Sequence, residues 1–177
     1  MNGSFQESSQ RRDNVSLDIR TYRNTDGPEL CAVFSAHYQA AGLPCTMTPL
    51  SLELCILAKA FFSPAQMLVA EKDGQVVGFL LLGFEPEDPL LTASSTRAVV
   101  SSLCVRPCEQ EDRIASELLA SSVSRCGQMG CEQLSFSPPP PASPFMAGLA
   151  PGDGMIGGPE IDFRLTRWLR ASGWVSG

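Results

Sequence analysis

The sequence predicts one α/β domain with a mixed, mostly antiparallel central sheet flanked by helices. The clearest signal is a pair of apolar runs within Met67–Glu85, on either side of Asp73-Gly74, which is typical of a tight antiparallel hairpin. A second signal lies within Ser101–Leu119, where a β-prone run is followed by Pro107 and then by a helical pattern. Because another strand follows that helix, the crossover adds a parallel strand to the sheet. The chain has 177 residues, of which 44% are hydrophobic, and this is enough for one domain with a core.

The first third of the chain predicts a strand and two helices. Residues 1–14 are polar and lack the apolar stretch of a secretory signal, so we expect a disordered lead-in before a domain at 15–177. Val15–Tyr22 alternates apolar and polar residues and predicts the first strand. Asp26 is a typical N-cap for the helix that follows. The apolar positions of that helix are Leu30, Val33, Phe34 and His37. A second helix is expected over Leu50–Phe62, because Ser63-Pro64 would end it.

The remaining elements are expected in a fixed order along the chain. They are the hairpin strands Met67–Lys72 and Gln75–Glu85, a loop at 87–96, a strand at Arg97–Val105, a helix ending near Gly127 or Gly130, a strand at Cys131–Ser137, the segment Pro138–Pro159, a helix at Glu160–Trp174 with Asp162 as its cap, and the beginning of a strand at the C-terminus. The segment Pro138–Pro159 is rich in proline and glycine and is long for a connection within a domain, which is typical of a functional or mobile loop.

Charge and cysteine usage exclude several classes of protein. The formal net charge is -6, which argues against a nucleic-acid partner because phosphate backbones need a basic footprint. No apolar run approaches the length of a membrane span, so we expect no membrane partner. The seven cysteines are odd in number and mostly in apolar surroundings, which predicts reduced thiols in the cytoplasm. Their spacings are not those of a zinc knuckle, so we expect no metal site.

Four segments of the chain resemble, in order, segments of the GNAT superfamily of acyl-CoA-dependent N-acyltransferases. They are LDIRTYRNTDGPEL, LVAEKDGQVVGFLLLG, SSLCVRPCEQEDRIASELL and PFMAGLAPGDGMIGGPEIDFRLTRWLRASGW. The resemblance covers nearly the whole of 15–175 and implies the GNAT acyl-CoA N-acyltransferase fold. It also implies acetyl-CoA as co-substrate and an amine of a small molecule or a protein as acceptor. The last segment is similar to a bacterial subgroup often built of two tandem domains, so the implied protein partner is a second GNAT domain or a second copy.

The resemblance also implies where the cofactor binds. The residues that match the strand pairing with the pantetheine arm are Leu103, Cys104 and Val105, and those that match the pyrophosphate loop are Gln110, Glu111, Asp112, Arg113, Ile114 and Ala115. An extended arm can pair with a free strand edge, and a helix N-terminus favours negative charge. The acids of this loop would repel a phosphate, although first-turn acids also offset the helix dipole when no ligand is bound.

Arg113 stands where the family places its central glycine. Its side chain either crowds the ligand, in which case Arg113→Gly tightens CoA binding, or pairs with phosphate, in which case the change weakens binding. We favour the first alternative, because the neighbouring carboxylates Glu109, Glu111 and Asp112 would already occupy the guanidinium.

Direct acyl transfer to an amine requires a base, and two strand carboxylates are the candidates. They are Glu71 and Glu85, each of which also fits a solvated strand residue. The only histidine, His37, is expected to be a packed or half-exposed helix residue, and Cys104 a buried and inert thiol. Family members often use a tyrosine near the last helix as the acid, but the matching region here offers Trp168 instead.

Two functions therefore stand as alternatives: an N-acetyltransferase, or a degenerate GNAT-fold domain that serves as a scaffold or interaction module. The family sheet continues with two further strands after the last helix, and this sequence ends at Gly177. Cys131–Ser137 should then present an open edge. We expect self-association or a second domain at that edge rather than cover by Pro138–Pro159, because proline and glycine make a poor strand.

Overall fold

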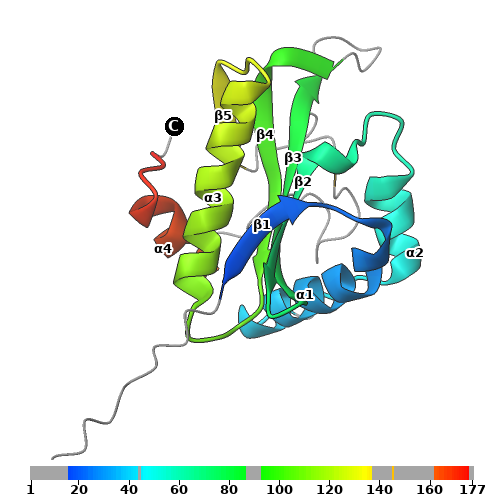
Figure 1. Ribbon diagram of the computed structural model, residues 1–177, viewed down its shortest axis with the longest axis vertical. Helices are drawn as coiled ribbons and strands as arrows, with labels where there is room; N and C mark the ends of the chain where they lie inside the picture. The colour runs from blue at the N-terminus through cyan, green and yellow to red at the C-terminus, as the bar shows by residue number, and fades with distance from the viewer. Residues whose placement is uncertain (1–15, 44, 87–92, 137–144, 146–161, 176–177) are drawn as a thin grey trace, which may run out of the picture.

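A five-stranded sheet in the order β1-β2-β3-β4-β5 forms the centre of the computed structural model (Figure 1). The structure describes residues 16–43, 45–86, 93–136, 145 and 162–175. The strands are β1 (Leu17–Thr21), β2 (Met67–Lys72), β3 (Gln75–Pro86), β4 (Ala93–Val105) and β5 (Gln133–Phe136). The first three pairings are antiparallel and the β4–β5 pairing is parallel, so the predicted mixed, mostly antiparallel sheet is confirmed. The predicted lead-in at 1–14 and all of Pro138–Pro159 except Phe145 lie outside the described residues.

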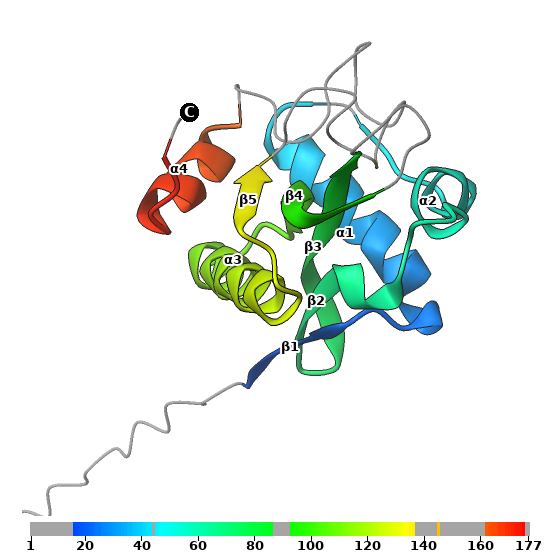
Figure 2. The ribbon, with the colours of Figure 1, turned by 90° about the horizontal axis from the view of Figure 1, so that it is seen from above.

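Helices cover both faces of the sheet (Figure 2). They are α1 (Gly27–Ala40), α2 (Pro49–Leu52) with a π-helical turn at Glu53–Leu57, α3 (Glu111–Gln128) and α4 (Phe163–Ala171), with short 3₁₀ turns at Asn24–Asp26 and Pro64–Gln66. Figure 2 shows α1 and α2 on one side of the sheet and α3 and α4 on the other. In Figure 1, α1 runs across the lower end of the strands, so its last turn comes close to the end of β4.

Three predicted boundaries are wrong. The second helix ends before Phe61 and Phe62, whose rings contact Phe145 instead. The fifth strand begins after Cys131, because the Cys131 amide donates to the Cys126 carbonyl in the C-terminal cap of α3. The fourth strand begins within the predicted loop at 87–96, because β3 extends to pair with it at Pro86. Residues 174–175 form no strand.

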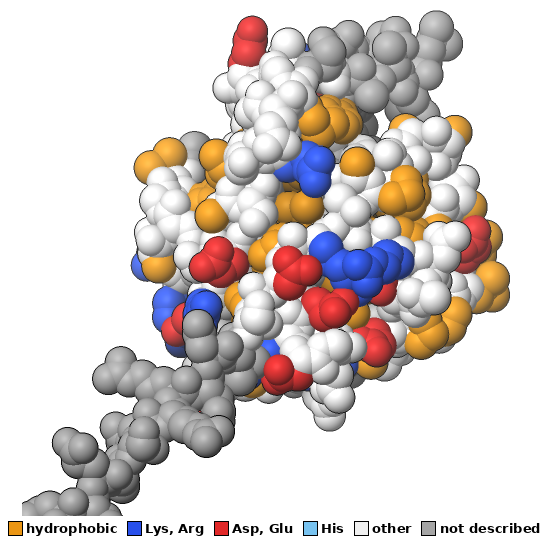
Figure 3. All heavy atoms as spheres, viewed as in Figure 1, with side chains coloured by type: hydrophobic (Ala, Val, Ile, Leu, Met, Phe, Trp, Pro, Cys, Tyr) orange, Lys and Arg blue, Asp and Glu red, His pale blue; other side chains and the backbone are white. Residues whose placement is uncertain are grey.

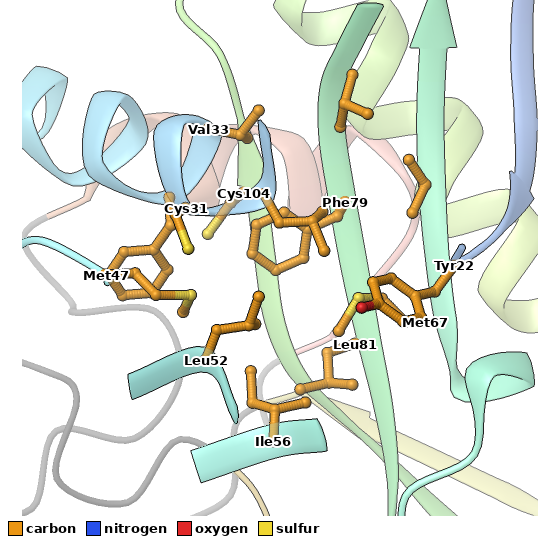
Figure 4. Packing of buried hydrophobic residues seen from close by; sticks show 14 of the residues in the cluster. Tyr22, Cys31, Val33, Met47, Leu52, Ile56, Met67, Phe79, Leu81 and Cys104 are labelled. Atoms are coloured by element: carbon orange, nitrogen blue, oxygen red, sulfur yellow. The ribbon is translucent and has the colours of Figure 1, made fainter. Parts of the chain in front are cut away.

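The two faces of the sheet carry two separate cores, as the alternation of side chains along a strand requires. Phe79 and Leu81 of β3 lie with Leu52 and Ile56 on the side of α1 and α2 (Figure 4). Leu80, between them in sequence, packs on the side of α3 and α4. The hairpin turn has a positive φ at Asp73 (52°) and Gly74 (76°), which confirms the predicted tight turn.

Gly78 allows α3 to pack closely against β3. A Cβ atom at this position would lie 3.0 Å from Ile114 Cγ2 and 3.2 Å from the Cys104 carbonyl oxygen. We expect Gly78→Ala to lower the free energy of unfolding by about 1–3 kcal/mol, because overpacking displaces the start of α3. Urea unfolding measures the change. Gly27→Ala is the control, since its Cβ would lie 3.7 Å from Leu52, and an equal loss in both variants would contradict this account.

Candidate functional site

The C-terminal part of β4 has no neighbouring strand, among the described residues, on the side opposite β3. We call this side of the strand the free edge. β5 pairs with β4 only from Arg97 to Val100, whereas β3 pairs with β4 up to Val105. The Arg106 amide donates to the Val77 carbonyl at 2.8 Å on the β3 side. Because hydrogen-bonding direction alternates along a strand, Leu103 and Val105 turn their backbone groups toward the free edge. This edge can therefore accept an extended ligand.

The free edge leads directly to the N-terminus of α3. This helix has 18 residues, and its N-cap, Gln110, makes no side-chain capping bond. The side chains of Ile114 and Ala115 on the helix and of Leu103, Cys104 and Val105 on the strand are all buried. Only backbone groups of these five residues are therefore suited to meet a ligand. We call Leu103–Val105, the loop 106–110 and the first turn of α3 together the β4–α3 junction.

The acids of this junction have partners on α4. Arg164 Nη1 lies 3.2 Å from Glu111 Oε2, and Arg167 Nη2 lies 3.1 Å from Glu111 Oε1. Trp168 Nε1 donates to Asp112 Oδ1 at 2.6 Å, and Arg167 pairs with the same oxygen. These contacts, with the Trp168 bond as the largest cause, lower the pKa of the Asp112 carboxyl. The acidic residues thus attach α4 to the beginning of α3.

Arg113 is not held by its neighbours. The expectation that nearby carboxylates occupy its guanidinium is wrong, because Glu111 and Asp112 pair with α4 instead. Arg113 is exposed and forms no ion pair with any residue that the structure describes. Its guanidinium is therefore available to an anion.

A buried cluster lies beside the junction, where His37 of α1 meets Asp162 and Arg164. His37 Nε2 lies 3.2 Å from Asp162 Oδ2, and both side chains are at most 2% exposed. Arg164 Nη2 donates to the His37 carbonyl at 2.7 Å and lies 3.2 Å from His37 Nδ1. The amide of Val105, on the free edge, also points at Nδ1 from 3.4 Å. This cluster therefore closes part of the edge that β5 leaves free.

Asp162 has two roles in this cluster. Its Oδ1 accepts from the amides of Arg164 and Leu165, which confirms it as the predicted cap of the last helix. Burial opposes its ionisation, yet His37, the Leu165 amide and Arg164 together hold the pKa of its carboxyl below the usual value. His37 is confirmed as a packed helix residue, but its partners lie far along the chain, and no local pattern in the sequence indicated them.

The two candidate bases lie far apart. Glu71 is 27% exposed on β2, beside the hairpin turn, and accepts from Arg20 Nε at 2.6 Å. Glu85 is 20% exposed at the other end of β3 and accepts from Arg97 Nε at 2.8 Å. The structure brings neither of them to the β4–α3 junction. Burial raises the pKa of Cys104 to about 12, which agrees with the expected inert thiol.

The net negative charge does not form a uniform acidic surface. Figure 3 shows basic and acidic side chains next to one another across the face seen in Figure 1. All seven cysteines are free, and in the described part of the chain no three metal-ligating side chains come together. No helix among these residues is both long and apolar enough to cross a membrane.

Comparison with known proteins agrees with this geometry. The model of a family described as "Acetyltransferase (GNAT) family" matches residues 30–143. The aminoglycoside N-acetyltransferase AAC(6')-Iy in complex with CoA has a TM-score of 0.59 at 13% identity, over 93% of this chain and 91% of that chain. An aminoglycoside acetyltransferase, meta-AAC0020, from an uncultured soil metagenomic sample, in complex with sisomicin, has a TM-score of 0.59 at 16% identity, over 91% and 90%.

A GNAT family acetyltransferase from Brucella melitensis in complex with acetyl-CoA has a TM-score of 0.56 at 17% identity, over 82% of this chain and 97% of that chain. At these identities the likeness concerns the fold, and it confirms the predicted α/β architecture with helices on both faces of the sheet. No curated protein matches the sequence.

Proposed function

Because the chain belongs to the acetyltransferase (GNAT) family, we propose that it transfers an acetyl group from acetyl-CoA to an amine of a small molecule or a protein. The observation that supports this most is the β4–α3 junction, where a free strand edge leads into a helix N-terminus. Three solved structures of similar fold are acetyltransferases, and two of them contain CoA or acetyl-CoA.

The junction offers two kinds of backbone contact to the cofactor. The pantetheine arm would pair with the backbone of Leu103 and Val105 along the free edge. The pyrophosphate would lie at the amides between Gln110 and Ala115, where the dipole of an 18-residue helix favours an anion. Arg113, exposed and without an ion pair to the described residues, would add a charged hydrogen bond to a phosphate oxygen.

The transfer joins the amine nitrogen to the acetyl carbon, breaks the bond from that carbon to sulfur, and releases CoA as a thiol. The amine must lose a proton, so a base is required. Glu71 and Glu85 remain the proposed bases, and each would act from a half-buried ion pair with an arginine. We propose amine acceptors in general, because no side chain of the junction indicates a narrower class.

A non-catalytic scaffold is the second candidate, and one specific observation favours it. The acids of the junction pair with α4, and the Val105 amide faces His37, so side chains occupy the place proposed for the cofactor. CoA binding separates the two candidates. A scaffold that has lost its cofactor site would leave CoA unbound in every variant described below.

Replacing Arg113 tests where the cofactor binds. We expect Arg113→Ala to weaken CoA binding by about tenfold to a hundredfold, the equivalent of a charged hydrogen bond of roughly 1.5–3 kcal/mol. Calorimetry measures the dissociation constant. Arg125→Ala, near the other end of the same helix, is the matched control.

Cys108 gives a readout that needs no activity. It is exposed in the loop before α3, so bound CoA should protect it from alkylation by N-ethylmaleimide. Tighter binding by Arg113→Ala would show that the side chain crowds the ligand. Binding of CoA without protection of Cys108 would place the cofactor on another surface.

A further inference from the structure

Arg164 crosses the end of β4 and connects helices from both faces of the sheet. Its Nη2 donates to the His37 carbonyl in the last turn of α1, at 2.7 Å. Its Nη1 contacts Glu111 in the first turn of α3, at 3.2 Å. Because α1 and α3 lie on opposite faces (Figure 2), the side chain spans the free edge beyond β5. A ligand that runs from the N-terminus of α3 onto this edge has to pass the same place.

His37 occupies the hydrogen-bonding position at that edge. Its Nδ1 lies 3.4 Å from the Val105 amide and 3.2 Å from Arg164 Nη2. Both neighbours are donors, so Nδ1 is the acceptor and the proton is assigned to Nε2, which faces Asp162 at 3.2 Å. The Val105 amide, which would otherwise pair with an extended arm, therefore already has an internal partner.

Both apolar and polar contacts attach α4 to the domain. Of its nine residues, only Leu165 and Trp168 are buried, and Phe163 is 83% exposed. Leu169 packs against the same apolar core as these two residues, and the polar contacts are the ion pairs and the indole hydrogen bond to the first turn of α3. Asp162 Oδ2 and Arg164 Nε are buried but make no hydrogen bond to any described residue, so the closed arrangement is incompletely satisfied. The Arg164 contacts can break while Leu165 and Trp168 stay in the core on the α3 side of the sheet.

We propose that α4 is an internal latch that keeps the β4–α3 junction closed to the cofactor. In the arrangement described, Arg164 and His37 occupy the free edge, and α4 holds the first turn of α3. CoA binds only when the Arg164 contacts break, so the latch and the cofactor compete. This inference rests on the proposed function, since it concerns access to the same junction.

Arg164→Gln tests the latch against a matched control on the same helix. Arg170→Gln makes the same change of charge, but Arg170 is exposed and forms no ion pair with the residues described. We expect Arg164→Gln to bind CoA about tenfold more tightly than wild type, because each charged contact that closes the latch opposes binding by roughly that factor. Arg170→Gln should bind as wild type does. Hydrogen exchange of the α4 amides without ligand should be faster in Arg164→Gln alone.

A second pair of variants tests the same contacts by changing residues at the start of α3. Glu111→Gln weakens the contacts to both arginines of α4, whereas Glu109→Gln removes a nearby charge that has no ion pair to the described residues. If the latch operates, Glu111→Gln increases CoA affinity by more than Glu109→Gln does. This pair keeps the test valid if Arg164→Gln fails to fold.

Each outcome decides between the latch and the proposed function. Binding by Arg164→Gln but not by wild type supports both. Equal or weaker binding by Arg164→Gln and Glu111→Gln, with binding by wild type intact, overturns the latch and leaves the proposed function standing. If neither wild type nor any variant binds CoA, both proposals fail.

Discussion

Arg20→Met should lower the free energy of unfolding by about 3–5 kcal/mol, because it leaves a buried carboxylate without its cation. Arg20 Nη1 and Nη2 contact the two oxygens of Asp26 at 2.7 and 2.9 Å, and the Asp26 side chain is 5% exposed. The same guanidinium contacts Glu71 through Nε. Guanidinium-chloride unfolding at neutral pH measures the loss.

Arg23→Met is the matched control for this prediction. Arg23 is 64% exposed and lies 3.9 Å from Glu71, so removal of its charge should cost less than about 1 kcal/mol. Adding Asp26→Asn to Arg20→Met should restore part of the lost stability, because the buried charge is then absent. Equal losses in Arg20→Met and Arg23→Met would show that the contact with Asp26 does not carry the effect.

The effect of Arg20→Met should also depend on pH. Burial opposes ionisation of Asp26, but Arg20 and the Arg23 amide keep the pKa of its carboxyl below the usual value. A carboxyl with a lowered folded-state pKa contributes stability above its unfolded pKa of about 4, and this contribution is lost as the pH falls through the folded pKa. The difference between wild type and Arg20→Met should therefore shrink below about pH 4. A difference that stays constant from pH 7 to pH 3 would contradict the assignment.

Asp162→Ala should cost about 2–4 kcal/mol and release α4 from the rest of the domain. The change removes an N-cap, worth roughly 0.5–2 kcal/mol, and also removes the buried carboxylate that lies 3.2 Å from His37 Nε2 and 3.7 Å from Arg164 Nε, a loss of roughly 1–3 kcal/mol. Chemical unfolding measures the loss of stability. Faster hydrogen exchange of the backbone amides of 163–171 would show that this loss is located in α4.

Asp162→Asn separates the two contributions. Asparagine is also a good N-cap, so this variant should keep the helix start and lose only the charge of the carboxylate beside His37 and Arg164. We expect its stability to lie between those of wild type and Asp162→Ala. A loss in Asp162→Asn as large as in Asp162→Ala would assign the whole effect to charge, and no loss would assign it to capping.

Among the described residues β5 lies at the edge of the sheet, and self-association and a second domain remain predictions. The groove between β5 and α4 includes Phe136 and Trp174, whose rings contact each other edge to face. Nothing in the described residues indicates what would cover this groove.

Local sequence patterns predicted the parts of the fold that depend on neighbouring residues. Asp73-Gly74 predicted the hairpin turn because both residues tolerate a positive φ, and both adopt one. The two apolar runs on either side of this turn predicted β2 and β3, and their side chains reach two opposite cores. The segment 101–119 predicted the junction, because a β-prone apolar run is followed by Pro107 and then by a helical pattern.

The roles of the charged residues at the junction depend on tertiary contacts. Glu111 and Asp112 had a sufficient local explanation as acids in a first helical turn, so their α4 partners were not predicted from sequence. His37 and Asp162 meet although they are far apart in sequence, and the periodicity of one helix carries no information about a partner beyond it. Ion pairing depends on the packing of α4 against the ends of α1 and α3, and that packing exists only once both faces of the sheet are covered.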